Sequence, residues 1–163
     1  MPLTKPQAEV INSKKRFRVL ISGRRFGKTF LAINELAKFA RFPNKKVWYV
    51  SPSYRQSKNI CWLMLKDKIL QHRWAKKIND SELSITLKNN SIIQLKGADN
   101  EQSLRGVGLD FIVLDEFADI KPEAWYEVLR PTLSDTLGHA LFCGSPKGFN
   151  FAYDLYTRQD KEW

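Results

Sequence analysis

One apolar run restricts the folds that are open to this chain. Residues Asp110 to Leu114 predict a strand in which four apolar residues, Phe111–Leu114, follow one another without polar alternation. A strand that is apolar on both faces has to be covered on both faces, which is typical of a parallel sheet between layers of helices. Two acidic residues, Asp115 and Glu116, follow this run directly. The segment therefore predicts an α/β fold with a buried central strand.

The rest of the chain alternates short β-like runs with helical patterns. Further strands are predicted at residues 17–21, 46–50, 84–87, 92–95 and 140–143, and 84–95 reads as a hairpin. Helices are predicted at about 29–40, 56–71 and 122–129, and from about residue 151 onward. A length of 163 residues suits one domain. This order predicts a mostly parallel sheet between helices.

A glycine-containing loop joins the first predicted strand to the first predicted helix. The pattern of a phosphate loop is a glycine, any four residues, and Gly-Lys-Ser/Thr, and here only the first glycine is replaced, by Ser22. Backbone N–H groups and the helix N-terminus of such a loop bind phosphate oxygens. The expected nucleotide contacts are Ser22, Gly23, Arg24, Arg25, Phe26, Gly27, Lys28 and Thr29. Lys28 would reach the β- and γ-phosphates of ATP, and the Thr29 hydroxyl would bind Mg²⁺. The alternative is a glycine turn that Thr29 caps, with Lys28 in solvent.

The acidic pair supplies the second half of the predicted chemistry. A buried strand would deliver Asp115 to the carboxyl edge of the sheet, where phosphate loops also lie. There Asp115 could hold Mg²⁺ through its water shell, and Glu116 could polarise the water that attacks the γ-phosphate. The alternative is that both acids cap the next helix. GTPases read guanine with an Asn-Lys-x-Asp motif, which is missing from the sequence, so ATP hydrolysis is the better interpretation.

Composition limits the possible partners and compartments. The net charge is +10, which suits a polyanion such as DNA without requiring one. Cys61 and Cys143 belong to no CxxC or Cys/His cluster, which argues against a zinc site and for a reducing compartment. No apolar run reaches the roughly 18 residues that cross a bilayer, and no secretory signal opens the chain. We expect a soluble, intracellular protein without a membrane partner.

With these motifs identified, the chain resembles the N-terminal ATPase region of the large terminase subunit of tailed phages. The resemblance runs from Lys5 to about Tyr156 and rests on the phosphate loop, the acidic pair and two further segments. These segments are Trp48–Gln56, after the second strand, and Cys143–Gly148, which is similar to the coupling motif of that family. The resemblance implies a P-loop NTPase of the RecA-like, additional-strand (ASCE) class. Superfamily 2 helicases share part of these motifs and remain the nearest alternative.

The resemblance implies further roles for single residues. Gln7 matches a glutamine that reads adenine, the alternative being a surface glutamine that starts a helix. Arg24 matches an arginine on the γ-phosphate, although Arg25 could serve equally well by charge. Arg105 matches an arginine finger that reaches the ATP of a neighbouring subunit, the alternative being a surface salt bridge. Gly144 and Ser145 would couple the γ-phosphate to motion, unless they form only a tight turn.

The resemblance also implies a setting for the whole protein. ATP hydrolysis would drive double-stranded DNA into a procapsid through a ring of subunits, with the portal protein and the small terminase subunit as partners, in the host cell cytoplasm. Large terminases also carry a nuclease domain, so we expect residues 1–163 to be a truncated N-terminal ATPase domain. A binding module that holds nucleotide without turnover is a further alternative.

Overall fold

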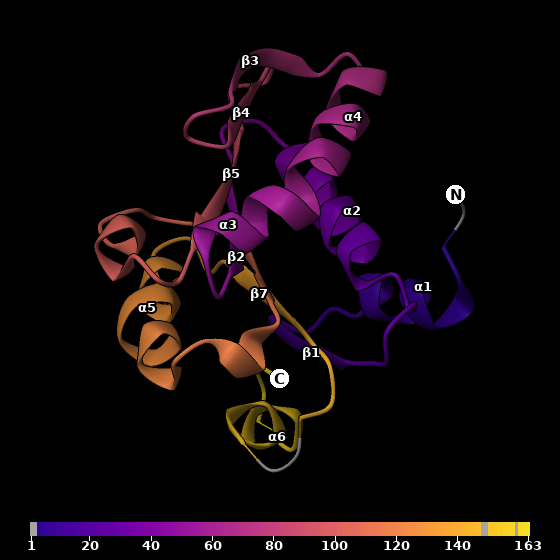
Figure 1. Ribbon diagram of the computed structural model, residues 1–163, viewed down its shortest axis with the longest axis vertical. Helices are drawn as coiled ribbons and strands as arrows, with labels where there is room; N and C mark the ends of the chain where they lie inside the picture. Colours follow the sequence, from indigo (N-terminus) through magenta and orange to yellow (C-terminus); the bar gives the residue numbers. More distant parts are fainter. Residues whose placement is uncertain (1–2, 148–149, 159) are drawn as a thin grey trace.

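The computed structural model describes residues 3–147, 150–158 and 160–163, which form a seven-stranded sheet between helices (Figure 1). The strands are β1 Phe17–Ile21, β2 Lys46–Ser51, β3 Ala75–Asn79, β4 Ser84–Leu87, β5 Ile92–Gly97, β6 Phe111–Asp115 and β7 His139–Gly144. Their order is β1-β7-β6-β2-β5-β4-β3. The pairs β1–β7, β7–β6, β6–β2 and β2–β5 are parallel, whereas β4 runs antiparallel to both β5 and β3. The predicted mostly parallel sheet and the 84–95 hairpin are both confirmed.

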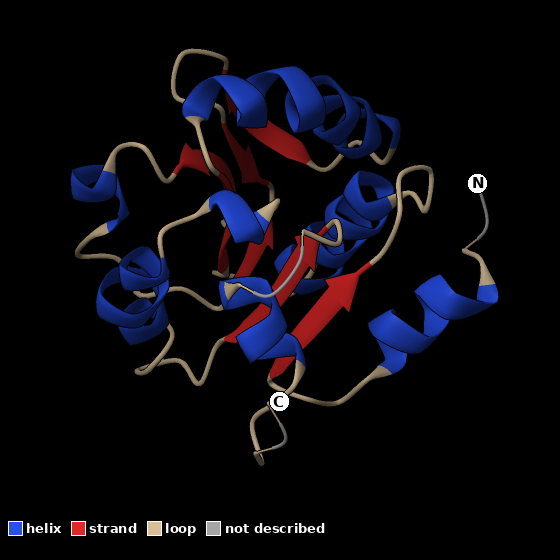
Figure 2. Cartoon of the chain, turned by 60° about the horizontal axis from the view of Figure 1, so that its bottom comes forward, coloured by secondary structure: helices blue, strands red, loops and turns tan. Residues whose placement is uncertain are grey.

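Helices cover both faces of this sheet (Figures 1 and 2). One group consists of α1 Lys5–Asn12, α2 Lys28–Ala40, α3 Tyr54–Ser57, the π-helical η1 Lys58–Trp62, and α4 Leu63–Gln71. The other comprises the π-helical η4 Ala124–Leu129, α5 Arg130–Thr132, α6 Phe151–Tyr156, and the short 3-10 segments η2 Glu101–Leu104 and η3 Phe117–Asp119. Across the described ranges, every helix is too short or too polar to cross a bilayer.

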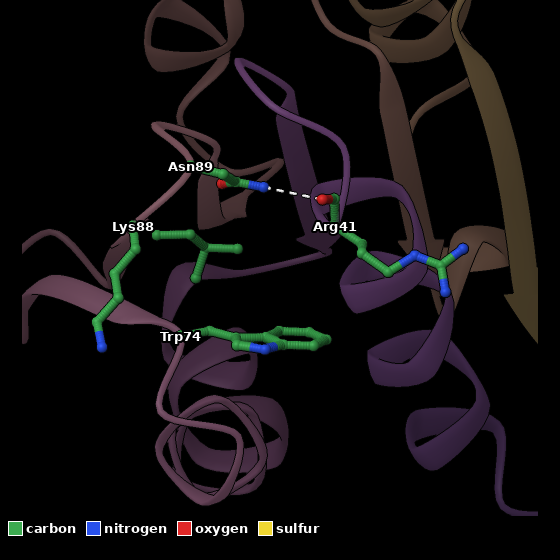
Figure 3. Close-up of a pocket in the computed structure, with 5 residues that line it drawn as sticks. Arg41, Trp74, Lys88 and Asn89 are labelled. Atoms are coloured by element: carbon green, nitrogen blue, oxygen red, sulfur yellow. Dashed lines mark hydrogen bonds between the residues drawn. The ribbon is translucent and has the colours of Figure 1, made fainter.

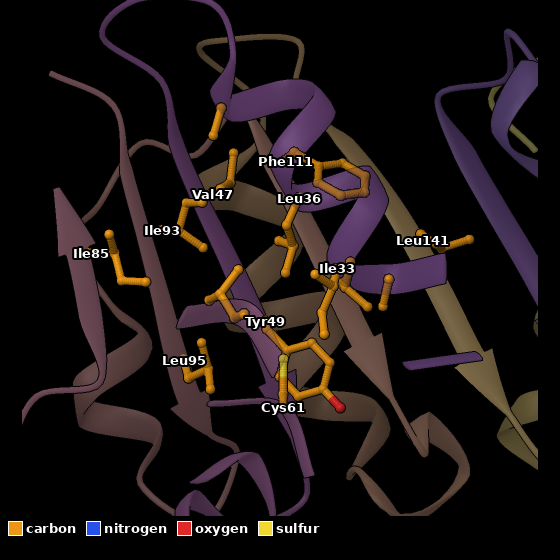
Figure 4. Close-up of a cluster of buried hydrophobic side chains, with 14 of the residues drawn as sticks. Ile33, Leu36, Val47, Tyr49, Cys61, Ile85, Ile93, Leu95, Phe111 and Leu141 are labelled. Carbon is orange, nitrogen blue, oxygen red and sulfur yellow. The ribbon is translucent and has the colours of Figure 1, made fainter. Parts of the chain in front are cut away.

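Two apolar clusters, one on each face, hold these layers together. The first packs α2 and α4 against the sheet, and its members include Leu36, Leu65 and Phe111, all with 0% exposure. Figure 4 shows part of this cluster, with Leu36 and Phe111 labelled. The second packs Trp125, also fully buried, and neighbouring apolar residues of η4 and α6 against the other face. Because β6 contributes Phe111 and Val113 to one cluster and Ile112 and Leu114 to the other, it is apolar throughout.

Several elements differ from the sequence-based expectation, among them β3, β6 and the helix that ends with α5. The edge strand β3 was not predicted, because its Lys76 and Lys77 are exposed and its apolar residues do not alternate regularly. Strand β6 begins and ends one residue later than predicted, so Asp115 is its last residue. The helix that was expected to end at about Leu129 continues through Pro131 to Thr132. Pro131 lies in the last turn of this continuous helix, which ends one residue beyond it.

Gly97 provides a test of how closely β5 approaches the start of α3. A Cβ atom at Gly97 would lie 2.1 Å from the backbone nitrogen of Tyr54 and 2.2 Å from Oδ1 of Asp99. Gly97→Ala should therefore lower the free energy of unfolding by about 1–3 kcal/mol, as overpacking does. Gly108→Ala is the matched control, because no described atom lies within 4 Å of its added Cβ. Urea unfolding measures both, and an unchanged midpoint for Gly97→Ala would contradict the close approach.

Candidate functional site

The loop between β1 and α2 forms one wall of the candidate site. Gly27 is the N-cap of α2 and has a φ of 82°, in the left-handed region that favours glycine. A Cβ atom here would also lie 2.9 Å from Nε2 of Gln7. The first N–H groups of the 13-residue helix α2 have no intrahelical partners, and the helix dipole adds positive potential at this end. The loop and the helix start are thus arranged to receive an anion.

Lys28 lies folded over this loop instead of extending into solvent. Its Nζ donates to the carbonyl oxygen of Ser22 at 2.9 Å and to that of Gly23 at 3.3 Å. Neither Lys28 nor the exposed Arg24 and Arg25 forms an ion pair with any residue that the structure describes. The loop therefore carries positive charge that the described carboxylates leave uncompensated.

The end of β6 forms the opposite wall. Asp115 is 4% exposed, and its Oδ2 accepts a hydrogen bond of 2.5 Å from the hydroxyl of Tyr49. Burial raises the pKa of the Asp115 carboxyl and Glu116 adds to the effect, while the Tyr49 hydroxyl and Lys28 oppose it. Glu116 adopts a left-handed backbone with a φ of 48°, which is uncommon for a residue with a side chain and often marks a functional position.

Tyr49 is a site residue that sequence analysis missed. It lies in β2, beside β6, where it pairs in register with Val113. Burial and the neighbouring Asp115 raise the pKa of its hydroxyl well above the usual range, so it remains a hydrogen-bond donor. The available signal was a single hydroxyl inside the apolar segment from Val47 to Val50. Its partner could not be known before the strand order was known.

The hydroxyl of Ser145 brings the two walls together. It lies 3.3 Å from Nζ of Lys28 and donates to Oε1 of Glu116 at 3.4 Å. The residue before it, Gly144, ends β7 and accepts a hydrogen bond of 3.1 Å from the N–H of Ser22. Phosphate loop, acidic pair and the 144–145 segment therefore meet at the carboxyl edge of the sheet. Gly148, the last residue of the predicted coupling motif, lies outside the described residues.

The contacts do not support the alternative that Asp115 and Glu116 both cap the next helix. Glu116 precedes the 3-10 turn η3, but its side chain makes no capping hydrogen bond there. Asp115 is buried inside the sheet edge and is held by Tyr49. The charge of Lys28 instead acts on the Asp115 carboxylate, and Glu116 accepts a hydrogen bond from Ser145.

Gln7 and Arg105 occupy very different surroundings. Gln7 is 5% exposed, so it is not a surface residue. Its Oε1 accepts from the N–H of Thr4 at 2.9 Å, and its Nε2 donates to the carbonyl oxygen of Phe26 at 2.7 Å, which joins α1 to the phosphate loop. Arg105 is exposed, and no hydrogen bond or ion pair joins its side chain to a described residue of this site.

The oxygen donors at the site fit a magnesium ion. Thr29 lies in the first turn of α2, and Asp115 offers a carboxylate; oxygen atoms of this kind are the ligands that Mg²⁺ prefers. Among the described residues, no group of three or more His, Cys, Asp or Glu side chains could hold a metal by itself. A magnesium ion here would therefore depend on phosphate and water oxygens, as is usual for Mg²⁺ at nucleotide sites.

A separate cavity lies away from these loops. It encloses about 240 Å³ and is lined by Arg41, Trp74, Leu87, Lys88 and Asn89 (Figure 3). The Nδ2 of Asn89 donates to the carbonyl oxygen of Arg41 at 3.0 Å across its rim. Because it contains neither carboxylates nor residues of the phosphate loop, this cavity is not the site described above.

Comparison with known proteins places this arrangement in one family. The family described as "Terminase large subunit, T4likevirus-type, N-terminal" matches residues 19–163. The large terminase subunit of Escherichia phage T5 is 33% identical over 159 residues, which cover 93% of this chain and 36% of that protein. The large terminase subunit of Thermus phage G20c is 30% identical over 172 residues, which cover 92% of this chain and 35% of that protein.

A solved structure agrees with the fold. The large terminase ATPase domain of Thermus phage P74-26 has a TM-score of 0.83 at 28% identity, over 96% of this chain and 69% of that chain. This similarity confirms the predicted RecA-like, additional-strand class, and the superfamily 2 helicase alternative is not favoured. The chain spans about a third of the length of the curated relatives that it matches. By its motifs, sequence and fold, the chain belongs to the family of large terminase subunits and matches the N-terminal part of that family.

Proposed function

We propose that this chain binds Mg²⁺ and ATP at the carboxyl edge of the sheet and hydrolyses ATP to ADP and phosphate. The convergence of Lys28 and Glu116 on the Ser145 hydroxyl carries this proposal. It puts a cation without an ion-pair partner among the described residues and a carboxylate on the same hydroxyl, beside a helix N-terminus. A triphosphate bound between them would contact the cation with its phosphates and present its γ-phosphate to the carboxylate.

Different residues would bind phosphate, hold the metal ion and accept the proton. Lys28, Arg24 and the N–H groups of the loop would bind the β- and γ-phosphates and neutralise charge that develops on them. Thr29 and Asp115 would hold the magnesium ion, which supplies further charge neutralisation when bound. Glu116 would accept a proton from water while the water oxygen attacks the γ-phosphorus and the bond to the ADP oxygen breaks. The Glu116 side chain makes no capping hydrogen bond to η3, which leaves the carboxylate available for this role.

Ser145 could report the state of the γ-phosphate. Its hydroxyl is shared by Lys28 and Glu116. A bound γ-phosphate would compete for Lys28, so Ser145 and the adjacent end of β7 would change partners as the nucleotide is hydrolysed. Gly144 is tied by its carbonyl oxygen to Ser22 of the phosphate loop, so a shift here would reach both segments.

In the whole protein, we infer that this cycle drives double-stranded DNA into a procapsid. Membership in the large terminase family and the ATPase domain of phage P74-26 support this inference. The assembly would be a homo-oligomeric ring that contacts the portal protein and the small terminase subunit. Gln7 would read the adenine, and the exposed Arg105 would reach the nucleotide of a neighbouring subunit.

Glu116→Gln tests hydrolysis directly. The amide keeps the size of the side chain but cannot accept the proton, so turnover should fall about 10²–10⁴-fold while ATP binding stays within a few-fold of wild type. Phosphate release and calorimetric binding measure the two effects, with the exposed Glu123→Gln as control. Lys28→Ala should instead lose binding. Equal turnover in Glu116→Gln and wild-type protein, or ATP binding without turnover in the assembled protein, would favour a simple binding module.

Mixing variants of the full-length protein tests whether Arg105 acts between subunits. Arg105→Ala and Glu116→Gln proteins should each be inactive, because loss of an arginine finger costs about 10³–10⁵-fold in rate. Mixed rings should regain activity, because an Arg105→Ala subunit would receive Arg105 from its Glu116→Gln neighbour. The matched control is a mixture of Arg24→Ala and Glu116→Gln, which should stay inactive since both defects lie in the same site. Recovery in the control, or none in the first mixture, would contradict the proposal.

The buried carboxylate of Asp115 should cost stability. Its pKa is raised in the folded protein, so the folded state binds the proton more tightly than the unfolded state between the ordinary value of about 3.9 and the raised value. Stability contributed by this group is therefore lost as pH rises through that window. Asp115→Asn should unfold at a higher urea concentration than wild type at pH 7, and the advantage should shrink towards pH 4. The exposed Asp135→Asn is the control, and equal pH dependence of all three proteins would contradict the shift.

A further inference from the structure

A buried ion cluster lies behind the phosphate loop, between α1, β1 and α2. Its centre is Glu35 of α2, which is 0% exposed. One carboxylate oxygen of Glu35 lies 2.5 Å from Nη2 of Arg18, which is itself 7% exposed, and the other lies 3.4 Å from Nζ of Lys38. Neither oxygen accepts a well-aligned hydrogen bond from a described residue, so the two cations carry the compensation of this buried charge.

Both cations of the cluster also bind the end of α1. Nη1 of Arg18 donates to the carbonyl oxygen of Val10 at 2.8 Å, and Nζ of Lys38 donates to that of Ile11 at 2.8 Å. The last carbonyl groups of a helix lack partners within the helix, and positive charge is favourable there. Glu35 therefore holds two donors in place for the C-terminal turn of α1.

The same short helix carries Gln7 to the phosphate loop. Helix α1 has eight residues, a length that is not stable in isolation, so its position depends on tertiary contacts. At one end Gln7 donates to the carbonyl oxygen of Phe26, and at the other Val10 and Ile11 are held by the cluster. A displacement of the C-terminal turn would therefore move Gln7 relative to the loop.

Gln7 keeps capacity for a ligand in this arrangement. Its two hydrogen bonds use one of its two N–H groups and one lone pair of its oxygen. One donor and one acceptor remain, which is the pair that the Watson–Crick edge of adenine requires. A guanine edge presents a different order of donors and acceptors at these positions, and a site built on hydrogen bonds rejects such a mismatch.

We propose that Glu35, through Arg18 and Lys38, is a positioning residue that sets Gln7 for selection of adenine over guanine. This inference rests on the proposed reading of the base by Gln7. The chain of contacts runs from a buried carboxylate to two cations, from the cations to the carbonyl groups of α1, and along one helix to an amide beside the phosphate loop. A cluster that served only stability would not affect which base the site accepts.

Lys38→Met tests the proposal, because the Lys38 side chain is 44% exposed and its loss should leave the fold intact. Binding of ATP, GTP and inorganic tripolyphosphate, each with Mg²⁺, is measured by calorimetry on the chain. Removal of one hydrogen bond to α1 should weaken ATP binding about fivefold, reduce the preference for ATP over GTP, and leave tripolyphosphate binding unchanged. Lys45→Met is the matched control: Lys45 is 40% exposed and pairs with Asp110 at 2.9 Å, away from α1. It should change none of the three.

Two further variants distinguish an error in the proposed role of Gln7 from an error in the positioning proposal. Glu35→Gln should show the same pattern with a larger loss of ATP binding. If Glu35→Gln does not fold, the result for Lys38→Met decides the test. Gln7→Ala should abolish the preference for ATP, and adding Lys38→Met to it should have no further effect. If Gln7→Ala leaves the preference unchanged, the role of Gln7 is wrong and the positioning proposal falls with it. If Gln7→Ala changes the preference and Lys38→Met does not, only the positioning proposal is overturned.

Discussion

The parallel pairing of β1, β7 and β6 is the constraint on which the rest of the site depends. In its register Ile21 pairs with Gly144 and Asp115 pairs with Cys143, so three strands end at the same level. The residues that follow them must then emerge side by side. An antiparallel neighbour would place one of these ends at the far edge of the sheet. The contacts of Ser145 with Lys28 and Glu116 follow from this alignment.

Two buried carboxylates, Asp115 and Glu35, lie near the phosphate loop. Asp115 is compensated by one hydroxyl, from Tyr49, and its pKa remains raised, so it is kept at a cost in stability. Glu35 is compensated by Arg18 and Lys38, which in turn bind α1. Buried charges of this kind are weak evidence for a role in stability, because apolar groups of similar size are often as stable in their place. Our proposals give each carboxylate a role: Asp115 would hold a metal ion, and Glu35 holds the two cations that bind a short helix.

Local patterns were sufficient for most of the parallel sheet. The apolar run of β6 and the alternation of strands with helices express burial on both faces, and this is visible in a few consecutive residues. The phosphate loop is likewise a contiguous motif, with Gly27 required by its backbone. The edge strand β3 was missed because two of its five residues are exposed and burial there leaves no regular pattern. The helix that was expected to end at about Leu129 continues to Thr132, because its last turn accommodates Pro131.

The sequence by itself determined the order of the elements and the charged residues that follow each strand, because these properties are local. Only the tertiary structure decided which of these residues meet. Tyr49 and Asp115 are 66 positions apart, and Lys28 and Ser145 are 117 positions apart. Gln7 reaches the carbonyl oxygen of Phe26 only because α1 packs behind the loop. Such contacts are set by strand order and helix packing, which no short segment of the chain encodes.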